Sequence, residues 1–345
     1  MNPSLYMFFL LTLFLSTIIT LASNHWLLAW IGLELNTLTM LPLITTPHHP
    51  RATEATMKYF MVQTTASTVI LLAGAITAWQ TGQWALTQPG SATAILLTLA
   101  ILFKLGISPV HFWYPEVLQG ATMTTALILS TWQKLAPLAL LYMILNNLPN
   151  NLLLLLGLIS VITGSWIGLN QTQLRKLMAY SSIGHMGWLL IALVMNPKLA
   201  TFTLIIYLLM TTTMFIMMIN TTTKTTLDIG TIWPHSPTQA SFTMLTLLSL
   251  GGLPPLTGFS PKWLIIKDLT LNHLAPLATL LALMSLPALY FYVRLAYFTT
   301  LTTPPTTQLT TLMWRLKHTS NYTPAPIAVL TTLMMPLTAT FYLTV

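Results

Sequence analysis

Four charged side chains stand inside long apolar runs of this sequence, where a charge is energetically expensive. They are Glu34, Lys104, Lys134 and Lys262. Insertion scales assign a cost of about 2.5–3.5 kcal/mol to a charged residue at the centre of a membrane helix. A chain that keeps four of them needs a reason. One reason is structural: ion pairs between helices, or long side chains whose charged ends reach toward the membrane surface. The other reason is proton transfer.

Proton transfer by lysine depends on its surroundings. Burial favours the neutral amine, whereas a nearby carboxylate favours the ammonium. A glutamate–lysine pair whose separation changes can therefore bind and release a proton, and water between several lysines can pass that proton on. Two histidines in apolar surroundings can join because imidazole titrates near neutral pH, although a hydrogen-bonded contact between helices is an equal alternative for each. The candidates for a proton path are Glu34, Lys104, Lys134, Lys262, His111 and His185.

The composition of the chain indicates which class of protein contains these residues. Of the 345 residues, 54 % are hydrophobic and only 5 % are charged. Ordinary globular domains have about 25 % charged residues. This difference excludes disordered, secreted and soluble enzyme classes. The net charge of +8 could suggest nucleic acid, but the basic residues are scattered over the loops, as the positive-inside rule predicts. The absence of cysteine excludes disulfides, thiolate-held iron–sulfur clusters and cysteine nucleophiles.

Spanning a bilayer takes about 20 apolar residues, so at roughly 30 residues per span and loop the chain allows about eleven spans. Only helices satisfy their backbone groups within one segment in lipid, and these runs lack the alternation of a β-barrel. The sequence therefore predicts an all-α polytopic membrane protein. The expected segments are 3–22, 24–45, 54–79, 92–120, 122–146, 151–170, 174–195, 199–220, 238–270, 274–299 and 324–344.

Two of these segments contain proline-rich interruptions that must break a helix, because proline removes a donor and clashes with the preceding turn. The interruptions are Gly106–Glu116 and Gly251–Lys262. Three of their residues recur 146 positions further on (106 to 252), and a fourth position is charged in both interruptions. The pairs are Gly106 with Gly252, Pro109 with Pro255, Pro115 with Pro261, and Glu116 with Lys262. A looser echo relates Lys134-Leu135-Ala136 to Arg294-Leu295-Ala296.

These echoes predict two inverted five-helix repeats, because five is odd and paired broken helices are typical of inverted-repeat transporters. The expected domains are 3–147 with a break near 104–116, 150–299 with a break near 251–262, and 300–345 as a loop and C-terminal helix. With eleven spans, most basic loop residues fall on the side of the N-terminus, which should face the positive-inside compartment. Those residues are Arg51, Arg175, Lys176, Lys224, Arg315 and Lys317.

Two smaller charged features accompany the first break. Glu54 and Lys58 are four residues apart at the start of a segment, which favours an ion pair at a helix end. Glu116 has two interpretations: an ion partner at a helix end, or a contact to a neighbouring subunit. No phosphate-binding loop, dinucleotide fingerprint or close cluster with metal-ligand spacing is present in the sequence.

Taken together, the motifs resemble the antiporter-like membrane subunits of respiratory complex I, in the form encoded by vertebrate mitochondrial genomes. The resemblance runs essentially end to end, and the chain is also similar to the Mrp-type cation/proton antiporters. The resemblance to the complex I subunits rests on five groups of residues. They are Arg51–Ala55, Lys104–Gly106 with His111–Trp113 and Pro115-Glu116, Asn170–Gln173 with Arg175-Lys176, Ala179–Ile183 with His185–Trp188, and Leu250–Phe259 with Pro261–Trp263. Larger relatives carry additional N-terminal helices that this chain looks to lack.

The resemblance implies roles for the four buried charges, which all match the family in type. It implies proton translocation across the mitochondrial inner membrane, coupled to electron transfer from NADH to ubiquinone in other subunits. It places the N-terminus in the matrix and the C-terminus on the intermembrane-space side. Neither NADH, FMN, iron–sulfur clusters nor ubiquinone is expected to bind this chain.

The expected partners are other membrane-arm subunits, including neighbouring antiporter-like ones, and phospholipids such as cardiolipin, but not nucleic acid. Two alternatives stay open at this point. One is an Mrp-like secondary cation/proton antiporter subunit that works outside an oxidoreductase. The other is a structural spacer subunit without a working proton path, although four charges in apolar segments argue against a spacer.

Overall fold

The computed structural model describes residues 2–86, 89–233, 236–300, 325–338 and 340. Over this part of the chain the structure is helical and has no strand beyond two isolated bridges, which confirms the all-α prediction. Eight helical stretches of the described residues are long and apolar enough to cross a membrane, and one of them, Met123–Asn147, contains short helices joined by a 3₁₀ turn. The chain divides into two compact units, residues 1–160 and 161–345, with the boundary inside one helix.

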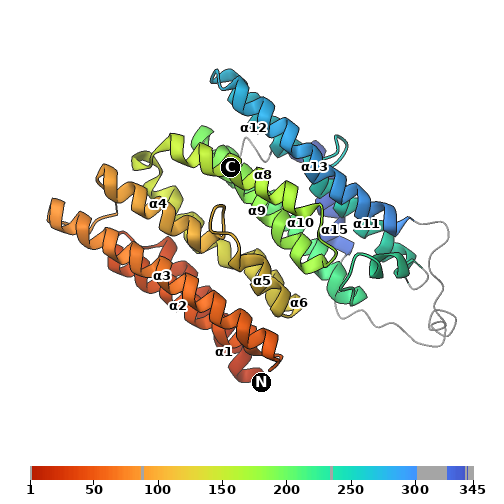
Figure 1. Ribbon diagram of the computed structural model, residues 1–345, viewed down its shortest axis with the longest axis horizontal. Helices are drawn as coiled ribbons and strands as arrows, with labels where there is room; N and C mark the ends of the chain where they lie inside the picture. The colour runs from red at the N-terminus through yellow and green to blue at the C-terminus, as the bar shows by residue number, and fades with distance from the viewer. Residues whose placement is uncertain (1, 87–88, 234–235, 301–324, 339, 341–345) are drawn as a thin grey trace. The chain divides into compact units, whose positions relative to one another are not determined.

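The first unit begins with three long helices, and Figure 1 shows them side by side in red to orange. The third helix is the longest. It begins at Pro50, which has no N–H that would need an acceptor, and it ends before Gly82, which has the left-handed conformation. Shorter helices follow, separated by irregular backbone. The elements are α1 (Pro3–Leu21), α2 (Trp26–Thr45), α3 (Pro50–Thr81), α4 (Ser91–Leu105), α5 (Trp113–Gly120), α6 (Met123–Ser130), η1 (Trp132–Lys134) and α7 (Leu135–Ile144).

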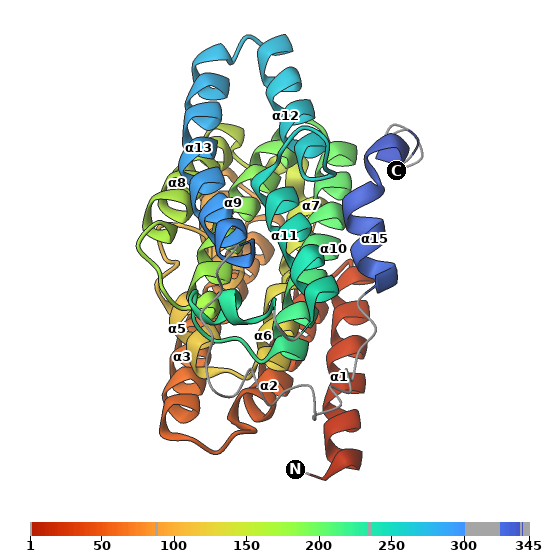
Figure 2. The ribbon, with the colours of Figure 1, turned by 90° about the vertical axis from the view of Figure 1, so that its right-hand side faces the viewer.

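The second unit contains four long helices and several shorter ones. Figure 2 shows α12 beside α13 and α15 beside α10, and each of these pairs is in contact. The elements are α8 (Asn150–Gly168), which contains the unit boundary, α9 (Leu174–Met195), α10 (Pro197–Thr221), η3 (Asp228–Thr231), α11 (Pro237–Gly251), α12 (Phe259–Leu271), α13 (Ala275–Thr299) and α15 (Ala325–Leu333).

Both predicted helix breaks are confirmed. Helix α4 ends before Gly106 and α11 ends before Gly252, and these glycines have φ of 70° and 83°. Such values disfavour any residue with a Cβ. The Gly106 N–H donates to the carbonyls of Leu102 and Phe103. The Gly252 N–H donates to those of Leu248 and Ser249, so each helix ends with the same local hydrogen bonds.

A third interruption was not expected. The sequence predicts one continuous helix over 122–146, but α6 ends at Ser130 and a 3₁₀ turn, η1, places Lys134 before α7. Pro137 explains this turn, because its ring would clash with the carbonyl four residues earlier, on Gln133. The correction matters because Lys134 lies at a bend and not in the middle of a regular helix.

Some predictions fall on residues that the structure does not describe. Arg315 and Lys317, two of the basic residues used for orientation, lie outside the described residues, as do most of 300–345 and residues 324, 339 and 341–344 of the expected last segment. The described part of that segment begins as helix α15.

Candidate functional site

Lys104 and Glu34 come together in the first unit. Lys104 lies in the last turn of α4 with 5 % of its surface exposed, and its ammonium has no hydrogen-bond partner among the described residues. The Glu34 carboxylate, on the neighbouring α2, interacts with it electrostatically, and its own buried Oε2 also lacks a hydrogen-bond partner. The two do not form a direct salt bridge. Their separation therefore leaves room for the interaction to strengthen or weaken.

Polar groups on α3 and η1 surround this pair. The Gln63 amide donates to the Lys104 carbonyl over 3.3 Å, and the Gln133 amide donates to the Tyr59 hydroxyl over 2.7 Å. Tyr59 is completely buried and interacts electrostatically with Glu34. Helix α3 thus contacts the segments that carry Lys104 and Lys134.

Lys134 is buried in the 3₁₀ turn, with 3 % of its surface exposed. Its ammonium lies 5.0 Å from the centre of the Tyr114 ring, in a cation–π arrangement. Tyr114 in turn belongs to α5, directly after the first break, and its Cβ and ring pack against the position where Gly106 lacks a side chain. The first break and Lys134 are therefore in contact through one aromatic ring.

His111 lies in the irregular backbone between α4 and α5 and is 3 % exposed. The centre of its ring lies 4.3 Å from that of Phe112, and the two rings are tilted by 31°. The structure thus places this candidate inside the first break, where backbone groups outside regular helix are available as partners.

Lys262 and His185 come together in the second unit. Lys262 lies in the first turn of α12 and donates to the Gly251 carbonyl over 2.7 Å, at the C-terminal end of α11. That end of a helix carries unsatisfied carbonyls and a partial negative charge, so the ammonium is held there by fixed backbone dipoles. His185, on α9, and Lys262 line the same cavity, together with Tyr207 and Trp188.

A second cavity is also lined by His185 and Lys262. Its wall includes Tyr292 of α13, whose hydroxyl oxygen lies 3.5 Å from His185 Nε2. The side chains of Lys262 and His185 thus line both cavities within the second unit, and the Tyr292 hydroxyl contacts the imidazole.

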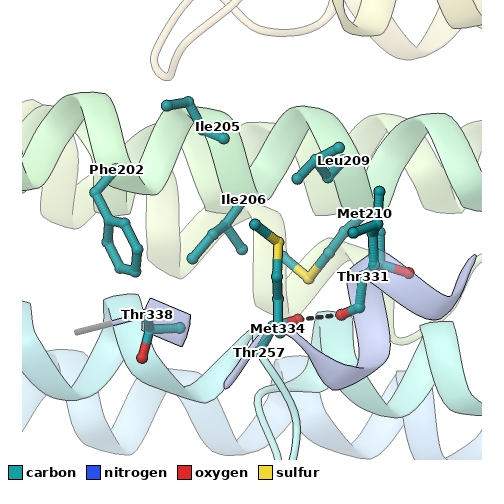
Figure 3. Close-up of a pocket in the computed structure, with 10 residues that line it drawn as sticks. Phe202, Ile205, Ile206, Leu209, Met210, Thr257, Thr331, Met334 and Thr338 are labelled. Atoms are coloured by element: carbon teal, nitrogen blue, oxygen red, sulfur yellow. Dashed lines mark hydrogen bonds between the residues drawn. The ribbon is translucent and has the colours of Figure 1, made fainter. Parts of the chain in front are cut away.

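A different apolar pocket lies beside the second break, between α10 and α15 (Figure 3). The Thr257 hydroxyl donates to the Thr331 carbonyl, which lies in the last turn of α15. A carbonyl in that turn lacks a partner within its own helix. This bond attaches the C-terminal helix to the break. Met210 lines this pocket and also the cavity of Lys262.

Two charged groups outside the apolar interior are Lys58, which forms ion pairs, and Asp228, which accepts backbone hydrogen bonds. Lys58 contacts both Glu54 and Glu116 at 2.5 Å, which confirms the predicted helix-end pair and shows that Glu116 has an ion partner within the chain. In the loop after α10, burial alone would raise the pKa of Asp228. The N–H groups of Thr225 and Lys224 donate to its carboxylate and hold the pKa below its ordinary value.

Three functional neighbours were missed in the sequence: Tyr59, Gln133 and Tyr292. An amide or hydroxyl side chain inside an apolar segment could have identified them. The many threonines in this sequence are also hydroxyl side chains inside apolar segments, so this feature does not single out the three residues. Among the described residues, no group of three or more histidine, aspartate or glutamate side chains could hold a metal ion.

The fold and these side chains define a multi-span helical membrane protein with ionisable groups buried at breaks in its helices. Residues 23–286 match the transmembrane family described as NADH:quinone oxidoreductase/Mrp antiporter, and residues 289–342 match the NADH dehydrogenase subunit 2 C-terminus. The chain belongs to the NADH-ubiquinone oxidoreductase chain 2 family. The family member from Polypterus ornatipinnis is 50 % identical over 317 residues, which is 92 % of each chain.

Solved structures give the same fold. A chain of respiratory complex I from Thermus thermophilus is 26 % identical, with a TM-score of 0.83 over 97 % of this chain and 77 % of its own. A chain of the Mrp complex from Dietzia sp. is 17 % identical, with a TM-score of 0.79 over 87 % of this chain and 61 % of its own.

Proposed function

We propose that this chain is a core membrane-arm subunit of proton-pumping NADH:ubiquinone oxidoreductase, complex I, and that it takes part in proton translocation. The observation that carries the proposal is the buried Lys104 ammonium, which has no hydrogen-bond partner within the part of the chain that the structure describes and whose charge Glu34 favours from a distance. The chain 2 relatives and the matching C-terminal family support the complex I role over a stand-alone Mrp-like antiporter. A spacer subunit would have no need of such a lysine.

In this proposal the charge of Lys104 follows its distance from Glu34. When the carboxylate is close, Lys104 keeps its proton, and when the carboxylate moves away, desolvation favours the neutral amine and the proton leaves. Lys134 and His111 accept and release protons in the first unit. Lys262 and His185 do so in the second, where they share a cavity.

We further propose the finer topology that the sequence predicts: eleven spans arranged as two inverted five-helix repeats, 3–147 and 150–299, with 300–345 as a loop and C-terminal helix. Two observations support this. The three expected segments that are not among the eight long apolar helices are the two with breaks and the last one. The helix ends at Gly106 and Gly252 have the same hydrogen bonds at the same offset in sequence.

The relatives' name and the apolar helices support a location in the mitochondrial inner membrane, with the N-terminus in the matrix and the C-terminus on the intermembrane-space side. The partners would be other membrane-arm subunits, including antiporter-like neighbours, and phospholipids such as cardiolipin. NADH, FMN, iron–sulfur clusters and ubiquinone would be bound by those other subunits, so electron transfer acts on this chain only through its neighbours.

The test uses fully assembled complex I carrying Glu34→Gln, reconstituted into vesicles, with protons translocated per NADH oxidised as the measurement. Removing the charge of Glu34 should lower this ratio, because Lys104 then loses the charge that holds its proton. The matched control is Glu54→Gln, which removes the same charge at an exposed helix end. A normal ratio and normal turnover in a correctly assembled Glu34→Gln complex would overturn the proposal.

A further inference from the structure

Thr257 lies inside the second break, and its side chain bonds to a helix outside that break. The residue is 2 % exposed. Its hydroxyl donates to the carbonyl of Thr331 in the last turn of α15 (Figure 3). A threonine in a helix commonly returns this bond to its own helix, as Thr243 does with the Ala240 carbonyl. The Thr257 bond instead joins the break to the C-terminal helix, 74 residues further along the chain.

The backbone of Thr257 bonds to the start of the helix that carries Lys262. The Thr257 carbonyl accepts hydrogen bonds from the N–H of Ser260 over 3.2 Å and from its hydroxyl over 2.8 Å. Ser260 and Lys262 both lie in the first turn of α12, which begins at Phe259. Thr257 thus contacts α15 through its side chain and the turn of Lys262 through its carbonyl.

The break also packs on the end of α11, where the acceptor of Lys262 lies. A Cβ added to Gly258 would overlap with the carbonyl oxygen of Ser249 and would lie 3.2 Å from the sulfur of Met210. The Lys262 ammonium donates to the Gly251 carbonyl over 2.7 Å, in the same last turn of α11. The position of the break on α11 therefore sets the distance between the lysine and its acceptor.

Helix α15 packs against the two helices on either side of this break. It contacts α10, which carries Met210, and α11, which ends at the break. It also lies in the part of the chain that matches the subunit 2 C-terminus, whereas the break lies in the part that matches the antiporter family. The Thr257 bond thus joins the antiporter-like part of the chain to the part that matches subunit 2.

We propose that α15 holds the second break against the end of α11 through the Thr257 hydroxyl, and that this attachment keeps Lys262 at the Gly251 carbonyl. Thr257 takes no part in proton exchange itself, so it is a positioning residue. When its bond to α15 is lost, the break moves more freely, and the ammonium loses part of the backbone contact that favours its charged form. The inference rests on the proposed function of Lys262 in proton translocation.

The test uses Thr257→Val in fully assembled complexes reconstituted into vesicles, because valine keeps the branched shape of threonine and lacks the hydroxyl. Hydrogen exchange at the amides of Phe259 and Ser260 should become about 2- to 10-fold faster, as expected when one hydrogen bond is lost. The protons translocated per NADH oxidised should fall toward the ratio of Lys262→Met. Thr257→Ser restores the hydroxyl and should return both measurements to normal.

A double variant and a control determine whether Thr257 acts through Lys262. In a complex that already carries Lys262→Met, Thr257→Val should lower the translocation ratio no further, because the two residues act as one element. The matched control is Thr243→Val, which removes another buried hydroxyl of this unit whose bond stays within its own helix. It should leave the ratio and the exchange at the break unchanged.

The outcomes separate this attachment from the function on which it rests. Unchanged exchange in Thr257→Val would overturn the inference, because α15 would then not hold the break. Faster exchange with a normal ratio, where Lys262→Met lowers the ratio, would overturn it too, because the bond would then be merely structural. A further loss in the double variant has the same meaning. If Lys262→Met and Glu34→Gln both translocate normally, the proposed function fails, and the exchange measurement still decides whether α15 holds the break.

Discussion

In the first break the lysine belongs to the helix that ends there, whereas in the second it belongs to the helix that begins there. Lys104 precedes Gly106 in α4, and Lys262 follows Gly252 in α12. The constant offset in sequence pairs Lys262 with Glu116, not with Lys104. The two breaks therefore share their backbone ends but not the position of their charge.

The surroundings of the two lysines differ accordingly. The Lys262 ammonium is hydrogen-bonded to the Gly251 carbonyl, a fixed backbone group that always favours the charged form. The Lys104 ammonium has no hydrogen-bond partner and interacts with Glu34 only at a distance. This comparison teaches that one backbone arrangement can give two lysines different partners, a fixed backbone carbonyl at one break and a distant carboxylate at the other, because the difference lies in what the ammonium reaches.

The largest expected effect is a difference of stability between two matched variants. Lys262→Met should destabilise the complex by about 1.5–3 kcal/mol, the contribution of a hydrogen bond to a charged group. Lys104→Met should destabilise it by less, about 1 kcal/mol, because no hydrogen bond is lost and the removal of a buried ammonium offsets the loss of its attraction to Glu34. Thermal unfolding of the assembled complexes measures both. Destabilisation of equal size in the two variants would contradict the comparison.

The second prediction concerns the glycines that end the two helices. Both have the left-handed conformation, so Gly106→Ala and Gly252→Ala should each destabilise by about 1–2 kcal/mol. Only Gly252→Ala should also disturb the lysine, since the added Cβ would lie 2.9 Å from Lys262 Nζ, whereas at Gly106 it would meet Tyr114. Proton translocation per NADH should therefore fall further in Gly252→Ala. Equal losses would show that the Lys262 position is not sensitive to its break.

Local chemistry explains what could be predicted from the sequence. Glycine and proline act on their own backbone, so both breaks were visible, and low charge indicated a membrane protein. The turn at Lys134 was missed because Pro137 acts on a carbonyl four residues earlier. The Tyr59–Gln133 bond joins residues far apart in the chain, and no spacing rule identifies it. Arg294 echoes Lys134 in sequence, but its role depends on which carbonyls it reaches in the fold.

The sequence similarity between the segments of Arg294 and Lys134 gives the third prediction. Arg294 donates to the Leu169 carbonyl over 2.9 Å and to the Gln171 carbonyl over 3.2 Å, just beyond the end of α8. Arginine stays charged in proteins, so we expect it to fix this helix end and not to carry protons. Arg294→Lys can reach only one carbonyl and should cost about 0.5–1.5 kcal/mol, with normal translocation. Hydrogen exchange at the Leu169 and Gln171 amides measures the local loosening.

A loss of translocation in Arg294→Lys without faster exchange at those amides would contradict this assignment. The matched comparison is Lys134→Arg in the first unit. It keeps the charge but fixes it, and so should lower the translocation ratio while leaving exchange near residue 169 unchanged.

The smallest effect is expected at Glu116, the residue that the sequence offset pairs with Lys262. Its carboxylate is half exposed and contacts Lys58, which also keeps Glu54 as a second partner. Exposed pairs contribute little, so Glu116→Gln should change turnover and translocation by roughly twofold or less. Glu54→Gln is the matched control, because it removes the other carboxylate of the same lysine, and the two variants should behave alike. If Glu116→Gln alone abolished translocation, the charge of the first break would act through the position equivalent to Lys262, and the contrast between the two breaks would be wrong.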